Sequence, residues 1–434
     1  MNSLQKSSFC TALFFLSIIS AYGQENTLDI KYKRSSLHTL MIADDAREHS
    51  EAIQDIFINA PLIDKFNNHI VNLRRIPKTD SSFIYTPLIE TTKKKGFLSK
   101  ISGDLNMGDN KEEKEFQHLA ALNYLNAKNI AKIMVSKWFN RSESGGFNMD
   151  LIAERGFYNA SDLDAKIAQN SERGSALLAD AGEALIKNTF VIVNDFNYTN
   201  KEEVAKKAKG ILGNITSVAA QYGNSDIALT SEATSGVIGV VGKGYVIKTR
   251  AHLYKLVWNE EVAAIFYNDF WNEDSNIDFE KKKAFDETDI FKLEYIGTET
   301  SWADLQSTSL TKKTNEELIR NATIKAIDNV IAKLQRKHEV FRTKTPLISS
   351  DPITAKIGLK EGLEKGDKYE VLEQVLNDNG VIEYERLGVI KVEKDQIWDN
   401  RYNADEENPS TIEYTTFSGT KKKYFAGMLI RQIN

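Results

Sequence analysis

The sequence is short of cysteine and histidine, and both shortages exclude kinds of chemistry. Cys10 is the single cysteine among 434 residues, and it lies in an N-terminal segment that we expect to be removed. The mature chain then has neither a disulfide bond nor a cysteine nucleophile. The six histidines are scattered, and neither His-Glu-x-x-His nor Gly-x-Ser-x-Gly occurs. The stability of the protein must therefore come from its hydrophobic core, for which the chain is long enough.

Long apolar runs are missing beyond the N-terminus. Residues 11–20, TALFFLSIIS, match the core of a signal peptide and are too short to span a bilayer. Ala21 and Gly23 then place small residues at the −3 and −1 positions of a cleavage site. We expect residues 1–23 to be a signal peptide and the protein to be periplasmic, outer-membrane associated or secreted. No lipid anchor is expected, because no cysteine follows the apolar run.

An excess of basic residues is absent as well. The chain has 56 Lys and Arg against 61 Asp and Glu, which gives a formal net charge of −5. Nucleic-acid binding favours a basic face, so no nucleic-acid partner is expected.

The glycine-rich stretch GVIGVVGKG, residues 236–244, does not fit a phosphate-binding loop. A Walker loop would need glycine at Val237 and a hydroxyl residue after Lys243, where Gly244 stands. The stretch is interpreted as flexible backbone before a strand, or as a mobile hairpin that orders on contact with a membrane or partner.

Metal ligands are sparse in the sequence. Glu115-x-x-His118 could supply two ligands from one helix face, but no second pair of this kind occurs. His118 is interpreted as a surface or capping histidine, and no metal or other cofactor is expected.

What is present indicates an α+β fold with a mixed α/β body, long helices and a small C-terminal β module. We expect an N-terminal α/β region at 24–110, a central α+β domain at 111–310 and a connecting helix at 311–344. Residues 345–434 contain short β-rich runs separated by Gly-Asp and Asn-Gly turns, which predict an antiparallel barrel or sandwich.

Helical spacing is clearest in three places. Asp44 and Asp45 could cap a helix that Pro61 ends. Apolar residues spaced by three and four predict one continuous helix over 116–138. A capping box from Thr314 to Glu317 predicts a long helix running to about residue 338. Further helices are expected over 161–187 and 201–223.

Strand patterns surround these helices. Residues 189–196, TFVIVNDF, match a buried strand, and residues 245–258 alternate as a strand with one solvated face. Lys248, Arg250 and His252 would lie on that solvated face. Residues 262–271 fit a hairpin or a helix, and the hairpin is preferred.

Carboxylates gather between residues 154 and 183. Glu154, Glu172, Asp180 and Glu183 could include an acid and base pair if their surroundings separate their pKa values. The same pattern suits helices with ion-paired Glu and Arg, and the glycine after Arg155 suits a helix end. A hydrolase of envelope glycan or peptide is therefore kept as an alternative function.

A second candidate site lies in the C-terminal tail. The segment IWDNRY presents Trp398, Arg401 and Tyr402 in an expected loop. Trp, Arg and Tyr dominate binding hot spots, so these three residues are the preferred contact site for a partner.

The tail also resembles a known kind of domain. The segments IGLKEGLEKGDKYEVLE and ERLGVIKVEK are similar to the small β-domain of Gram-negative envelope accessory proteins, such as flagellar assembly protein T and relatives of the curli secretion lipoprotein. The lipid-attachment cysteine of the latter is missing here, and the remainder resembles uncharacterised secreted bacterial proteins.

The absence of catalytic motifs, together with this resemblance, predicts a non-enzymatic binding or assembly role in the cell envelope. It also implies an envelope protein partner and possible peripheral contact with the outer membrane. A small-ligand-binding protein is a further alternative.

Overall fold

The computed structural model describes most of the chain after its first 34 residues. The described residues are 35–84, 111–158, 184–200, 244–306, 314–376, 382–402, 404, 412–420 and 424–433. The expected signal peptide, the helix predicted at 201–223, most of the helix predicted at 161–187 and residues 236–243 of the glycine-rich stretch lie outside this part of the chain.

The body is built on one sheet with the strand order β2-β1-β4-β5-β6, and β3 also pairs with β1. β1 is parallel to its three neighbours, whereas β4, β5 and β6 are antiparallel to one another. The strands are β1 (Ser36–Ala43), β2 (Asn67–Asn68), β3 (Arg75–Pro77), β4 (Thr189–Asn200), β5 (Gly244–Leu256) and β6 (Leu293–Gln306). Because β1 pairs with β4, the predicted N-terminal region and central domain share this sheet.

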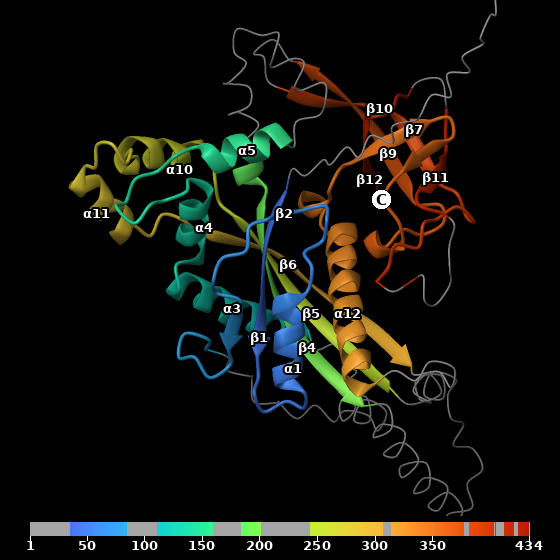
Figure 1. The fold of residues 1–434 in the computed structure, drawn as a ribbon, viewed down its shortest axis with the longest axis horizontal. Helices are drawn as coiled ribbons and strands as arrows, with labels where there is room; N and C mark the ends of the chain where they lie inside the picture. The colour runs from blue at the N-terminus through green and yellow to red at the C-terminus, as the bar shows by residue number, and fades with distance from the viewer. Residues whose placement is uncertain are drawn as a thin grey trace, which may run out of the picture.

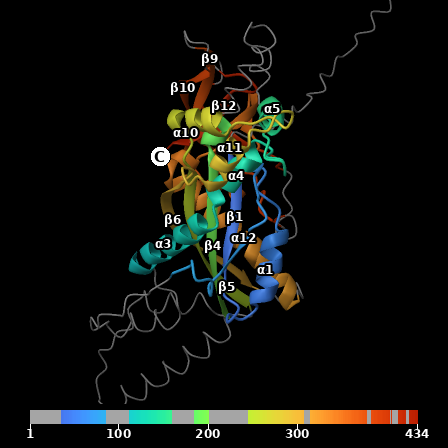
Figure 2. The same cartoon turned by 90° about the vertical axis from the view of Figure 1, so that its left-hand side faces the viewer.

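Helices cover both faces of the sheet (Figures 1 and 2). One face is covered by α3 (Lys111–Ala127), α4 (Ile130–Trp138), α5 (Asp150–Tyr158), α10 (Glu260–Ile265), the π-helical turn η1 (Phe266–Phe270) and α11 (Phe279–Glu287). The other face carries α1 (Ser50–Asn59) and α12 (Asn315–Lys337). The body therefore has three layers.

The predicted strand over 189–196 is confirmed as the first part of β4, and both its faces are buried. Val191 and Val193 pack into the cluster that includes α3 and α4, whereas Phe190 and Ile192 pack toward α12. Alternation of side chains along a strand sends neighbouring residues to opposite faces, which explains the continuous apolar run.

The predicted capping box is confirmed at the start of α12. The Thr314 hydroxyl accepts a hydrogen bond from the Glu317 amide, and the Glu317 carboxylate accepts one from the Thr314 amide. The apolar stripe of this helix is buried against the sheet, and it comprises Leu318, Ala322, Ala326, Val330 and Leu334.

Two helix predictions near the N-terminus are wrong in detail. The stripe over 116–138 is divided between α3 and α4, because Asn129 adopts a left-handed conformation with φ 52°. Asp44 and Asp45 do not cap α1, which begins at Ser50 after His49. Asp44 instead accepts hydrogen bonds from the Ala46 amide and Lys78 Nζ.

The hairpin preferred for residues 262–271 is also wrong, because the segment forms α10 and η1. The Asn259 side chain accepts a hydrogen bond from the Val262 amide and caps α10. Phe266 and Phe270 are buried, and Phe266 stacks on Phe139 with ring centroids 4.3 Å apart. Packing of these aromatic rings favours the helical backbone over the extended one.

The C-terminal module consists of antiparallel strands, so the predicted α+β class is confirmed. They are β7 (Thr345–Ser350), β8 (Ile353–Ala355), β9 (Lys368–Leu376), β10 (Ile382–Val392), β11 (Thr415–Ser418) and β12 (Leu429–Ile433). They pair in the order β10-β11-β8-β7-β12-β9, and β9 pairs again with β10. β12 thus lies between β7 and β9.

The module is attached to the outer side of α12. Arg336 donates two hydrogen bonds to the Asp367 carboxylate, at 3.1 and 2.8 Å, and another to the Gly362 carbonyl. The short 3-10 helix η3 (Leu359–Glu361) packs against α12, where Asp328 is buried. One helix therefore packs its apolar stripe on the body and polar residues on the module.

Candidate functional site

The predicted carboxylate cluster is represented in the described residues by Glu154 alone. Glu154 lies on α5 with an exposed side chain, and Glu172, Asp180 and Glu183 lie outside the described part of the chain. A site that combines the four carboxylates therefore stays a prediction.

The residue beside Glu154 has a structural role. Arg155 is buried within α5. The helix continues to Tyr158, so Gly156 does not end it as the sequence suggested. The Arg155 guanidinium lies 4.5 Å from the ring centroid of Trp138 and donates to the Asn68 carbonyl at 2.6 Å. It also lies 2.9 Å from His69 Nδ1. Burial, and then the charge of Arg155, hold the pKa of His69 well below its usual value, so the imidazole is neutral and can accept this hydrogen bond.

His118 is a buried aromatic residue, and the predicted surface or capping role is wrong. Its ring stacks on Tyr295 with centroids 3.8 Å apart, at the junction of α3 and the sheet. Among the described residues, no group of three or more His, Cys, Asp and Glu side chains is placed to hold a metal ion.

The face of β5 that the alternation assigned to solvent is buried. Lys248, Arg250 and His252 are 6%, 4% and 0% exposed. The prediction failed because α3 packs over this face, and Gln117 of α3 contacts both Arg250 and His252. Alternation of polar and apolar residues correctly separated the two faces of β5. It could not show that α3 would cover the polar face with Gln117.

These residues form a hydrogen-bond network. Gln117 Nε2 donates to Asp195 Oδ2 at 2.7 Å, and Gln117 Oε1 accepts from Arg250 Nη1 at 2.9 Å. These two partners fix the orientation of the amide, because a carboxylate accepts only and a guanidinium donates only. His252 Nε2 lies 3.1 Å from the same Oε1, and His252 Nδ1 lies 2.6 Å from Thr298 Oγ1. Both imidazole nitrogens are thus engaged inside the protein.

Arg47 joins the network from the loop between β1 and α1. Its Nη1 lies 2.6 Å from Asp195 Oδ1. Burial alone would raise the pKa of Asp195, but Arg47, Gln117 and the charge of Arg250 together hold that pKa below its ordinary value. Asp195 therefore stays ionised, and the arrangement is suited to fixing α3 and the β1–α1 loop on the sheet.

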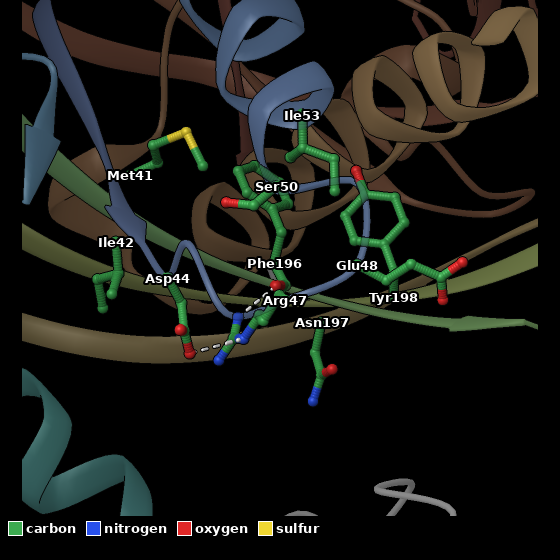
Figure 3. A pocket seen from close by; sticks show the side chains of 10 residues that line it. All are labelled: Met41, Ile42, Asp44, Arg47, Glu48, Ser50, Ile53, Phe196, Asn197 and Tyr198. Atoms are coloured by element: carbon green, nitrogen blue, oxygen red, sulfur yellow. Dashed lines mark hydrogen bonds and ion pairs between the residues drawn. The ribbon is translucent and has the colours of Figure 1, made fainter. Parts of the chain in front are cut away.

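A cavity of about 120 Å³ opens beside Arg47, between the β1–α1 loop and β4 (Figure 3). Its lining includes Asp44, Glu48 and Ser50 on the polar side, with Ile53 and Phe196 on the apolar side. Pockets for drug-sized ligands span roughly 300–1,000 Å³, so this cavity suits only a few waters or a very small molecule.

The predicted contact residues of the tail lie in the module, and two of them are held by internal contacts. The Trp398 amide donates to Thr415 Oγ1 at 3.0 Å, and its carbonyl accepts from the Leu359 amide at 2.9 Å. Arg401 forms an ion pair with Asp399 at 2.6 Å. Tyr402 is the most accessible of the three, with 38% of its surface exposed. Whether they bind a partner stays a prediction.

Sequence reasoning did not predict that one strand of the same module pairs with described strands along only part of one side. β10 pairs with β9 from Ile382 to Lys391, but its other side meets β11 only through Lys391 and Val392. No described strand pairs with that side over residues 382–390. In Figure 1 the β9–β10 hairpin extends beyond the other strands of the module. A strand side that no neighbouring strand pairs with presents backbone donors and acceptors to another extended segment.

The chain matches no known protein-family model, and no curated protein matches it significantly. The described helices include none with the length and apolar character needed to cross a membrane.

Proposed function

We propose that this protein is an exported, non-enzymatic binding or assembly protein of the bacterial cell envelope. Its C-terminal module would engage an envelope protein partner by pairing an extended segment of that partner with β10. The single observation that carries the proposal is that, over residues 385–390, no described strand pairs with the side of β10 that faces away from β9. Strand addition at such an edge is a common way for a protein to bind a peptide segment.

Two further features support this role over catalysis. The buried polar groups around Gln117 hydrogen-bond to one another, and both nitrogens of His252 are used in that network. Side chains along β10 are accessible, because Glu385 and Arg386 are exposed and Val389 is 37% exposed.

Site-specific photo-crosslinking in intact cells tests the proposal. A photoreactive phenylalanine derivative replaces Val389 on the β10 edge or, as the control, Phe279 of α11, which is 76% exposed. We expect one discrete envelope-protein adduct from position 389 and none from position 279. Mass spectrometry of the protein from the same cells should find Gln24 at its N-terminus.

A shortened hairpin gives the decisive comparison. Replacing residues 374–384 by Asn-Gly keeps the Glu373 and Glu385 pair next to a two-residue turn and leaves the β9–β12 pairing intact. We expect this variant to lose the adduct at position 389. Retention of the adduct, or its loss when Trp398, Arg401 and Tyr402 are replaced by alanine, would place the contact away from the β10 edge.

A further inference from the structure

Side chains of α12 contact the backbone of β6, the last strand of the body's sheet. Within the described sheet, β6 pairs with β5 and with no other strand. Lys333 Nζ donates to the Thr300 carbonyl at 2.6 Å, and Asn329 Nδ2 donates to the Trp302 carbonyl at 3.1 Å. Residues two apart on an antiparallel strand direct their carbonyls to the same side. A carbonyl that points at β5 is engaged in the ladder, so these two point away from β5.

The spacing of the two donors matches the spacing of the two carbonyls. Four residues of an α-helix rise about 6 Å, and two residues of a strand rise about 7 Å. Lys333 also lies 3.6 Å from the Glu299 carboxylate. His338, at the end of α12, packs so closely on Gly297 that a Cβ atom there would collide with its imidazole ring. Contacts from Gly297 to Trp302 therefore hold α12 along β6.

The sequence of β6 would otherwise allow two copies of the chain to pair through this strand. In a two-fold antiparallel pair centred on Ser301, Thr300 of one copy lies opposite Trp302 of the other. The charged residues nearest the centre, Glu299 and Asp304, each lie opposite a neutral residue in this register. The backbone hydrogen bonds of such a pair would need the two carbonyls that α12 already engages.

We propose that α12 blocks the outer side of β6 and thereby keeps the sheet of the body from pairing with β6 of a second copy. Lys333 and Asn329 are the blocking residues, because each hydrogen-bonds to a carbonyl that the second strand would use. Covering an edge strand in this way prevents its backbone donors and acceptors from pairing with other chains. The inference goes beyond the proposed function, since it concerns the body and not the C-terminal module.

Sedimentation velocity and photo-crosslinking of the purified protein test the inference. The double variant Asn329→Leu and Lys333→Met removes both donors and keeps side chains of similar size. We expect it to dimerise with a dissociation constant at least about tenfold lower than that of the original protein, because the dimer restores hydrogen bonds to the carbonyls. Trp302 is 39% exposed. A photoreactive phenylalanine derivative in its place should join two copies of the double variant and none of the original protein.

Control variants separate the lost donors from the added apolar surface. The pair Asn123→Leu and Lys337→Met makes the same changes at exposed positions and should leave the protein monomeric. Lys333→Arg keeps a donor and should also leave it monomeric. Lys333→Met alone should dimerise more weakly than the double variant, and it provides the comparison if the double variant does not fold. Thermal melting shows which variants fold.

Three results would overturn the inference. If the folded Lys333→Met and double variants stay monomeric, the contacts of α12 do not block the strand. If Lys333→Arg or the control at exposed positions dimerises as strongly as Lys333→Met, the association does not depend on the donors. If position 302 joins two copies of the original protein, the outer side of β6 is paired despite α12.

Discussion

At the scale of single residues, Gln117 links two buried charged groups, and no sequence pattern indicated this role. Its amide separates the Asp195 carboxylate from the Arg250 guanidinium and hydrogen-bonds to both. Replacing Gln117 by Leu would leave buried charged groups without these partners, so we expect a loss of about 2–4 kcal/mol in the free energy of unfolding. Asn123→Leu makes a similar change at an exposed position of α3 and should alter it by less than about 0.5 kcal/mol. Equal free energies of unfolding for the two variants, measured by urea unfolding, would show that the network does not stabilise the body.

The residues of this network show why the site was not predictable from the sequence. Arg250 lies opposite Asp195 only after β4 and β5 pair, and Gln117 reaches them only after α3 packs on the sheet. Each of these residues also fits a solvated strand or helix face, so local alternation alone assigns them to water. The contacts that bury them join residues that are far apart in the sequence.

At the scale of elements, local signals predicted the ends of α12 and the strand character of β4 and β5 well. Predictions failed where packing decided the outcome, as in the break between α3 and α4 at Asn129 and in the helical turns that replaced a hairpin after Asn259. A capping box acts between residues three apart, whereas the break at Asn129 depends on how two helices pack on one sheet.

The capping box of α12 gives an element-scale prediction. Thr314→Ala removes the hydroxyl that accepts from the Glu317 amide, and loss of an N-cap of this kind costs about 1 kcal/mol. Glu316→Ala, on an exposed residue of the same turn, is the control and should cost less. Thermal unfolding should show the lower Tm for Thr314→Ala. A larger effect of Glu316→Ala would mean that charge at the helix start matters more than the cap.

At the scale of the whole molecule, the junction between body and module should respond to pH through Asp328. Burial raises the pKa of Asp328 from 3.8 to about 6, and the neighbouring charges are Lys360, Glu361 and Asp64. Between about pH 4 and pH 6 the folded protein holds a proton that the unfolded chain has released, so the free energy of unfolding falls as the pH rises through this window.

Asp328→Asn should remove this pH dependence. The variant should be more stable than the original protein above about pH 6, by on the order of 2–3 kcal/mol, and the difference should vanish below about pH 4. Asp289→Asn, at a side chain that is 90% exposed, is the control and should leave the pH profile unchanged. Parallel stability profiles for Asp328→Asn and the original protein from pH 4 to pH 7 would contradict the assignment.

The position of β12 between β7 and β9 has a consequence for the order of synthesis. Residues 345–376 are synthesised well before residues 429–433, so β7 and β9 lack the strand that pairs with both of them while the intervening chain is made. During that interval both strands offer unpaired backbone to neighbouring nascent chains. A chaperone that shields them until β12 is synthesised would raise the yield of folded protein.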